Sequence, residues 1–380
     1  MLTTIILILI ISFLVLVHEF GHFITAKKTG VRVEEFGLGL PPRAFGKKFG
    51  DTIYSLNWLP FGGFVKLTGE DFDATDDPVP STDPRNFKSK TPWQRGLILV
   101  AGVVMNILTA VTLYYMMFGL TGFRTMTLPL FFDHDFRYGH MDKVSTVITD
   151  YADDSVAEIA GMEVGEAIIE VAGQPVYSAS DIRTSLEDKE GQSISVLLMD
   201  VRGLERDFRT VEVTPYADGE GVVLFGVYLT DAFNLDYSTS GYDKTRAGFF
   251  HAYNMLTYSA STLWNLSAMA VEEGDISPVS NSVSGPVGIS HAVSGVLSFK
   301  GKEAVIGLID LTALLSVSLA LLNMLPFPAL DGGRLVFVIF ELISGKKVNE
   351  KLEGNIHKFG MLFLLALLVL VTIKDVRGLF

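Results

Sequence analysis

Long apolar runs limit what this chain can fold into more than any other feature of its sequence. A helix needs about 20 residues to cross roughly 30 Å of hydrocarbon. Three runs reach that length, and a fourth is interrupted near its end by Asn323 and Pro326: residues 2–24, 97–119, 357–373 and, interrupted, 304–326. The 49% of hydrophobic residues and the positive mean hydropathy agree with this pattern. We expect an α-helical membrane protein with four transmembrane helices.

Two of the apolar segments in the chain allow more than one interpretation. The first run could be a signal peptide, but it has no basic segment before it and no small-residue cleavage site, which favours a membrane helix. Residues 246–271 are aromatic and apolar but contain His251, Asn254 and Asn265. They predict a helix at the membrane surface, with a fifth span as the alternative.

Charge placement predicts the orientation of the spans. Eleven of the 30 Lys and Arg residues lie between residues 25 and 95, and cytoplasmic loops are rich in these residues. Residues 120–280 hold 26 acidic and 10 basic side chains, so this region accounts for the whole net charge of −13. We expect residues 25–95 in the cytoplasm and 120–280 outside it. The acidic balance argues against nucleic acid as a partner.

The acidic region has the pattern of a small α+β domain. Short alternating runs such as EAIIEVAG and SISVLLMDV predict strands, and SASDIRTSLEDKEG predicts a helix. The order of these runs resembles a PDZ domain in its circularly arranged form. Gly161, Gly165 and Gly173 fit that pattern, whereas Glu166 stands where Asp is usual. Such a domain implies a groove for an extended peptide, and a steric cap with an unused groove is the alternative.

These patterns predict an order of segments along the chain. We expect two spans with a cytoplasmic β-loop in 1–119, the PDZ-like domain in 120–235, an interfacial helix and connector in 236–303, and two spans in 304–380. An amphipathic helix is also expected over 334–356.

The motif HEFGH, residues 18–22, lies inside the first span. His18 and His22 are four residues apart, so both rings leave one face of a helix and can share a metal ion. Glu19 is placed to act on a metal-bound water, as in the H-E-x-x-H motif of zinc hydrolases. Ionisable groups in a membrane span are costly and are usually paired or functional.

A catalytic zinc needs a third protein ligand, and the chain has no cysteine. Asp331 is the preferred candidate because it follows a span broken at Asn323 and Pro326, on a turn flanked by glycines. Asp310 is a rival carboxylate in the same span. It lies toward the outer end of its span, whereas the ligands must meet at one depth.

Together, HEFGH, NMLPFPALDGG and the PDZ-like insert resemble the site-2 protease family, in the bacterial branch represented by RseP and RasP. Further blocks, including FGLGLPPR, LNWLPFGGFVKL and SGPVGI, stand in family order. The resemblance implies an intramembrane zinc metalloprotease of the bacterial inner (plasma) membrane, with its active site toward the cytoplasm. It implies substrates that are single-pass membrane proteins, intact or cut beforehand, such as anti-sigma factors or remnant signal peptides.

Residue by residue, the resemblance implies a Zn²⁺ ion held by His18, His22 and Asp331, with Glu19 as general base and Asn323 on the substrate backbone. The residues alone also allow a hairpin on the cytoplasmic surface, but the resemblance favours a membrane-associated β-hairpin that clamps the substrate by strand addition. Four glycines would permit close approach: Gly37, Gly39, Gly62 and Gly63. Two other functions remain open, a membrane-anchored PDZ scaffold with a structural metal site and a metal transporter. The absence of an internal repeat disfavours the transporter.

Overall fold

The computed structural model divides into two compact units. It describes residues 2–70, 83–152, 155–202, 207–219, 221–274 and 284–377, together with Val279. The first unit has three segments and the second has two: Met1–Leu113, Leu266–Ser298 and Leu308–Phe380 in the first, and Tyr114–Asn265 and Phe299–Gly307 in the second.

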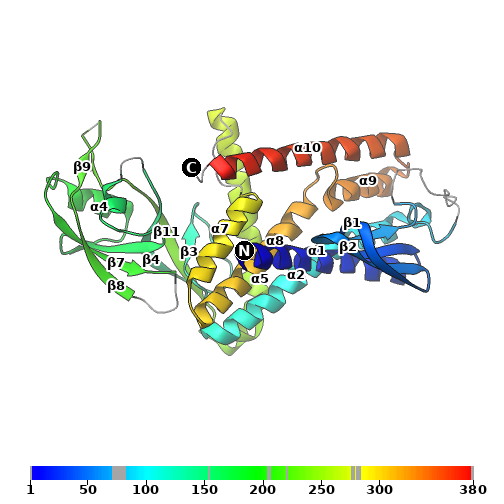
Figure 1. Ribbon diagram of the computed structural model, residues 1–380, viewed down its shortest axis with the longest axis horizontal. Coiled ribbons are helices and arrows are strands. Elements are labelled where there is room, and N and C mark those ends of the chain that lie inside the picture. Colours follow the sequence, from blue (N-terminus) through cyan, green and yellow to red (C-terminus); the bar gives the residue numbers. More distant parts are fainter. Residues whose placement is uncertain are drawn as a thin grey trace. The chain divides into compact units, whose positions relative to one another are not determined.

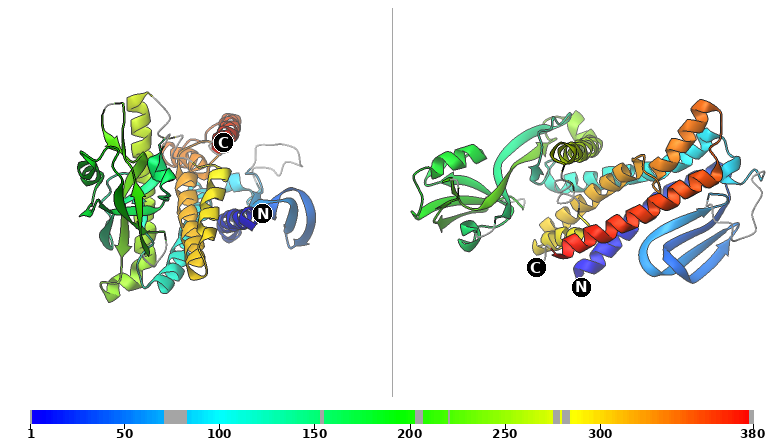
Figure 2. Two further views of the ribbon diagram at one scale, coloured as in Figure 1. Left: turned by 60° about the vertical axis from the view of Figure 1, so that its left-hand side comes forward. Right: turned by 90° about the horizontal axis from the view of Figure 1, so that it is seen from above.

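Within the described residues, four helices are long and apolar enough to cross a membrane, which confirms the predicted spans. They are α1 (Leu2–Lys28), α2 (Pro92–Thr121), α8 (Lys302–Met324) and α10 (Glu350–Arg377). At most 39% of the apolar stretch of any of them is buried inside the protein. The four helices run beside one another (Figures 1 and 2). Most of their outward surface therefore needs a lipid environment.

Helices α1 and α2 approach closely because Gly21 lies at their contact. A Cβ atom added at Gly21 would stand 2.3 Å from the carbonyl oxygen of Ala101. Small residues at such positions let helix backbones pack tightly in a membrane, where the hydrophobic effect between helices is weak. This contact places one face of α2 directly against the HEFGH segment of α1.

The β-hairpin consists of β1 (Val33–Phe49) and β2 (Thr52–Leu67), which pair antiparallel. Residues 33–38 of β1 pair on one side with the end of β2, as in Phe36 with Val65, and on the other side with its beginning, as in Phe36 with Tyr54. The two bent strands thus form a sheet of four stretches in the order end of β2, start of β1, start of β2 and end of β1. The end of β2 is therefore one edge of this sheet.

The end of β2 lies against α1 (Figure 1). The hydroxyl of Ser12 donates to the carbonyl oxygen of Pro60 at 3.1 Å and accepts from the backbone N–H of Gly62 at 3.2 Å. Large apolar side chains on the rest of the hairpin are exposed, among them Phe45, Phe49, Leu56, Trp58 and Phe61. Such a surface is typical of a hairpin that contacts the membrane.

Shorter elements complete the first unit: η1 (Phe87–Ser89), α7 (Pro286–Ser298) and α9 (Asp331–Ser344). A carboxylate oxygen of Asp375, near the end of α10, accepts the backbone N–H groups of Gly285 and Gly288, each at 2.9 Å. It therefore caps the start of α7. The helix predicted over 334–356 is wrong in extent, because α9 ends before Gly345, whose φ of 68° stops the helix.

The second unit is built on an antiparallel sheet with the order β3-β11-β4-β5-β7-β8, in which β6 also pairs with β5. The strands are β3 (Leu128–Leu130), β4 (His140–Tyr151), β5 (Glu166–Val171), β6 (Gln174–Pro175), β7 (Ile194–Asp200), β8 (Asp207–Val213) and β11 (Val227–Asp236). A separate ribbon pairs β9 (Tyr216–Ala217) with β10 (Val223–Leu224). The sheet carries α3 (Val156–Ile159) and α4 (Ala179–Leu186). Ile182 and Leu186 of α4 are buried with Ile168 and Leu198 of the sheet. This α+β architecture is that of the predicted PDZ-like insert.

Helix α5 (Gly241–Glu273) is long but is not among the helices apolar enough to span a membrane. Its polar residues make buried contacts in the second unit: Asn254 donates to the Tyr237 hydroxyl at 2.9 Å, and that hydroxyl lies 3.2 Å from His251 Nδ1. Burial lowers the pKa of His251 to about 3, so the ring is neutral.

Glu166, the departure from the PDZ pattern, is the centre of a polar cluster. Its carboxylate accepts from Arg209 Nε at 2.5 Å and Nη2 at 2.7 Å, and from the backbone N–H of Glu163 at 2.7 Å. Only 2% of its side chain is exposed. The carboxylate therefore holds the turn before β5 to strand β8.

Replacing Glu166 with Gln should lower the free energy of unfolding of the second unit by about 2 kcal/mol, because Arg209 loses its charged acceptor. Thermal unfolding and limited proteolysis of the detergent-solubilised chain would measure the loss. Glu170→Gln, on the same strand, is the control. Equal destabilisation by both changes would contradict a special role for Glu166.

Candidate metal centre

Helix α1 presents His18 and His22 on one face, one turn apart. Both side chains are buried, their ring centroids are 4.7 Å apart, and the two Nε2 atoms are separated by 3.1 Å. The i, i+4 spacing alone produces this geometry once the segment is helical. The two nitrogens point to the same place.

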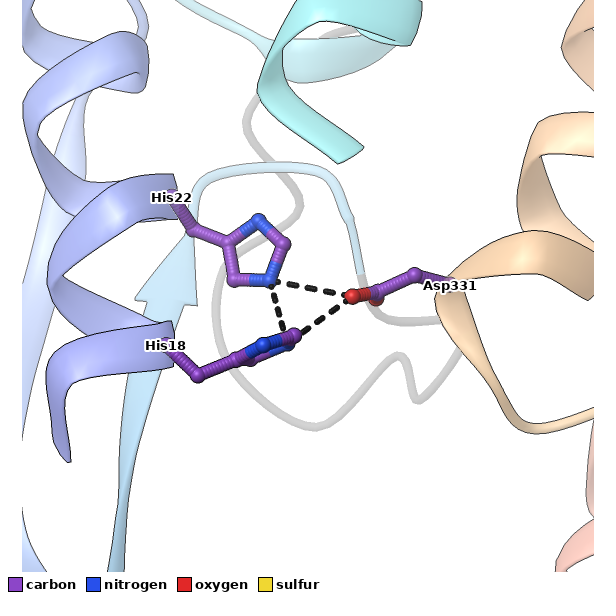
Figure 3. A group of neighbouring side chains, drawn as sticks. All are labelled: His18, His22 and Asp331. Carbon is purple, nitrogen blue, oxygen red and sulfur yellow. Dashed lines mark hydrogen bonds and ion pairs between the residues drawn. The ribbon is translucent and has the colours of Figure 1, made fainter. Parts of the chain in front are cut away.

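Asp331 reaches the same place from the first residue of α9 (Figure 3). Its Oδ2 atom lies 2.9 Å from His18 Nε2 and 3.2 Å from His22 Nε2. In the part of the chain that the structure describes, these three residues form the one cluster of His, Asp or Glu whose ligand atoms could hold a metal ion. Asp310, the rival carboxylate, is not in it.

The chain reversal between α8 and α9 depends on glycine. A Cβ atom at Gly332 would be 2.3 Å from the carbonyl oxygen of Leu325, and one at Gly333 would be 2.1 Å from that of Phe327. No larger residue fits where the start of α9 lies against the turn. The two glycines after Asp331 thus allow the start of α9, which carries the Asp331 carboxylate, to pack against the backbone of the turn that follows α8.

The spacing of the three ligand atoms fits a tetrahedral metal ion. A zinc ion bound to nitrogen and oxygen at about 2.0–2.1 Å requires its ligand atoms to be about 3.3 Å apart. The separations here are 2.9, 3.1 and 3.2 Å.

The hydrogen bond behind His22 also fits a metal ligand. His22 Nδ1 lies 2.8 Å from the carbonyl oxygen of Ile98, which can only accept, so Nδ1 carries the proton. In the neutral ring, Nε2 then has a lone pair directed at Asp331 and His18. A lone pair facing an anionic oxygen calls for a cation between them.

Helix α2 leaves room for the rings at Gly102. A Cβ atom there would be 2.5 Å from His22 Nε2 and 2.7 Å from His18 Nε2. The sequence reasoning missed this residue because glycine carries no chemical group. The signal was its place inside an apolar span, where glycine marks a close approach.

Glu19 contacts the edge of the hairpin rather than the three ligands. Its Oε2 atom accepts the backbone N–H of Val65 at 3.1 Å. This bond joins α1, which carries two of the three ligands, to the last stretch of β2. A carboxylate one residue from His18 is thus held between the metal centre and the edge strand of the hairpin.

The remaining predicted residues belong to α8 and to the β-hairpin. Asn323 is on the last turn of α8 and is partly buried. A Cβ atom at Gly62 or Gly63 would be 3.3 Å from Val15 or Leu16 of α1, respectively. Gly37 pairs with strands on both sides, and a Cβ atom at Gly39 would meet the carbonyl oxygen of Leu59 at 2.4 Å. These last two glycines shape the hairpin from within.

Comparison with known proteins is informative along the whole chain. The model of peptidase family M50 matches residues 6–367. A candidate zinc metalloprotease from Clostridium perfringens (strain 13 / Type A) is 32% identical over 97% of both chains. Another, from Clostridium acetobutylicum, is 30% identical over 98% of this chain and 96% of its own. The zinc metalloprotease RasP of Bacillus licheniformis is 27% identical over 100% of this chain and 99% of RasP.

Replacing Gly102 with Ala should lower zinc affinity by about 10- to 100-fold, because the added methyl group displaces both rings from their partners. Competition with a chromogenic chelator would measure it. Gly119→Ala on the same helix is the control, since nothing lies within 4 Å of the added atom. Alanine favours a helix over glycine, so unchanged zinc affinity in Gly102→Ala would contradict the placement of the rings against α2.

Proposed function

Because the chain belongs to peptidase family M50 and is a zinc metalloprotease, we propose that it cleaves single-pass membrane proteins within or beside their membrane-spanning segments. The observation that carries the proposal is the meeting of His18, His22 and Asp331 inside a unit of apolar helices. Protein substrates follow from the family. A site among membrane spans favours substrates that reach it through the bilayer.

In this proposal His18, His22 and Asp331 hold the zinc ion. Bound zinc supplies Lewis acidity, which makes a water molecule more acidic and polarises the scissile carbonyl group. The carboxylate of Glu19 accepts a proton from the attacking water as the water oxygen bonds to the carbonyl carbon. Glu19 then gives this proton to the amide nitrogen as the C–N bond breaks. The products are a carboxylate and an amine.

The end of β2 supports a way to present the substrate. A helical substrate hides its carbonyl groups in internal hydrogen bonds, so its cleavage requires an extended segment. Residues 63–67 pair with β1 on one side only, and the N–H of Val65 points to Glu19 on the other. A substrate strand paired with this edge would replace Glu19 at the Val65 N–H and pass beside that carboxylate, with alternate carbonyl groups free of hydrogen bonds. Asn323 would contact the backbone of the same segment.

Glu19→Gln should reduce cleavage of a single-pass model substrate by at least about 100-fold while zinc content stays equal to that of wild type. Glutamine has nearly the same shape and can still accept the Val65 N–H, so only proton transfer is lost. The measurement is product formation by the purified chain in detergent, with zinc assayed on the same samples. Equal cleavage by both proteins would reject the mechanism and favour a scaffold with a structural metal.

We also propose that the hairpin and the start of α10 face the cytoplasm of a bacterium and that the PDZ-like unit lies outside it. The support is the basic loop after α1 and the acidity of residues 120–280. An acidic folded unit outside the membrane would keep substrates with large outer domains from the site, so such substrates would need a prior cut.

The chain contains no cysteine, so single cysteines can test the orientation directly. In spheroplasts, an impermeant maleimide should label Glu190→Cys, in the PDZ-like unit, but label Lys346→Cys, before α10, only after permeabilisation. Both positions are exposed. The reverse pattern would invert the orientation, and labelling of both from outside would contradict the four-span topology.

A further inference from the structure

A buried asparagine lies behind His18 and has no role in the chemistry described so far. Asn106 of α2 is fully buried, and its Nδ2 atom lies 3.3 Å from His18 Nδ1. Its Oδ1 atom is also buried and has no hydrogen-bond partner in the described structure. An unsatisfied amide oxygen inside a membrane unit is costly, which suggests that this amide makes a different hydrogen bond in a second state of the site.

Asn106 belongs to a stripe of α2 that contacts both imidazole rings. Ile98, Gly102 and Asn106 are four residues apart and therefore lie on one face of the helix. The carbonyl oxygen of Ile98 meets His22 Nδ1, Gly102 lies beside both Nε2 atoms, and Asn106 meets His18 Nδ1. His22 meets Ile98 and His18 meets Asn106, so the two helices run in opposite directions here. Each ring has one partner on this stripe for the nitrogen that points away from Asp331.

The proton on His18 must change places when a metal binds. With Nδ1 accepting from Asn106 Nδ2, the Nε2 atom carries the proton and donates to Asp331 Oδ2 at 2.9 Å. A metal ligand needs a lone pair on Nε2, so in a neutral ring the proton must be on Nδ1. That N–H then requires an acceptor, and the amide nitrogen cannot accept.

We propose that Asn106 is a positioning residue that supports both forms of His18 by turning its amide group. A half-turn of the amide exchanges Oδ1 and Nδ2 with almost no change of shape. The oxygen that lacks a partner then accepts the Nδ1–H of His18 and fixes Nε2 as the ligand atom. Asn106 thereby does for His18 what the carbonyl oxygen of Ile98 does for His22. The inference rests on the proposed zinc site.

The test compares two replacements of similar size. Asn106→Leu removes the acceptor and should weaken zinc binding by about 10- to 100-fold, the usual effect of losing such a partner. Asn106→Asp keeps an acceptor oxygen and should bind zinc within about tenfold of wild type or more tightly, because a carboxylate partner raises the basicity of a histidine ligand. Zinc dissociation constants are measured by chelator competition on the purified full chain.

Ser316→Ala provides the matched control. The Ser316 hydroxyl donates to the backbone carbonyl oxygen of Asn106 at 2.8 Å, so its loss disturbs the same contact between α2 and α8 without touching the amide. It should leave zinc affinity within about twofold of wild type. Circular dichroism of the metal-free proteins identifies a variant that fails to fold. If the Leu variant fails to fold, zinc binding weakened more than about tenfold in the folded Asp variant would still overturn the inference.

Each outcome has a distinct meaning. Unchanged zinc affinity in Asn106→Leu, or equal weakening in the Leu and Asp variants, would overturn the role of Asn106 while the zinc site stands. Failure of the wild-type chain to bind zinc in the same assay would instead overturn the proposed function. Weakening by Leu with recovery by Asp, and no effect of Ser316→Ala, would support the inference.

Discussion

Two imidazole nitrogens and one carboxylate oxygen face a single point inside a unit of apolar helices. His18, His22 and Asp331 bring these atoms within 2.9–3.2 Å of one another. Polar groups of this kind are expensive away from water, and a shared cation is what makes their meeting favourable. The α1–α2 contact, the turn before α9 and the stripe on α2 all serve to hold this one arrangement.

Glycine gives the centre its compactness. At Gly21, Gly102, Gly332 and Gly333 an added Cβ atom would come within 2.1–2.5 Å of a backbone oxygen or a histidine ring. In lipid, helices associate through close packing rather than through burial from water. The residues that let helices touch are therefore the same residues that let ligands from different helices converge. The stability of the helix bundle and the assembly of the metal centre therefore depend on the same glycine contacts.

Much of the fold follows from the sequence, and the errors have local causes. The four spans and the α+β insert could be predicted because apolar length and strand alternation are properties of short segments. The prediction of one helix over 334–356 was wrong in extent, because Gly345 adopts a left-handed conformation that ends α9. Pro60, Gly62 and Gly63 predicted a turn in this segment, but the double pairing of β1 with both parts of β2 could not be seen, because a turn signal does not say which strand the returning part pairs with.

The sequence by itself determined the spacing of His18, His22 and Glu19, because positions four residues apart on a helix share a face wherever the helix lies. The tertiary structure decided what meets them. Asp331 is 313 residues from His18 along the chain, and the bond of Glu19 to Val65 and the contact of Asn106 with His18 also join separate segments. Such contacts depend on how helices pack, which periodicity within one segment cannot specify.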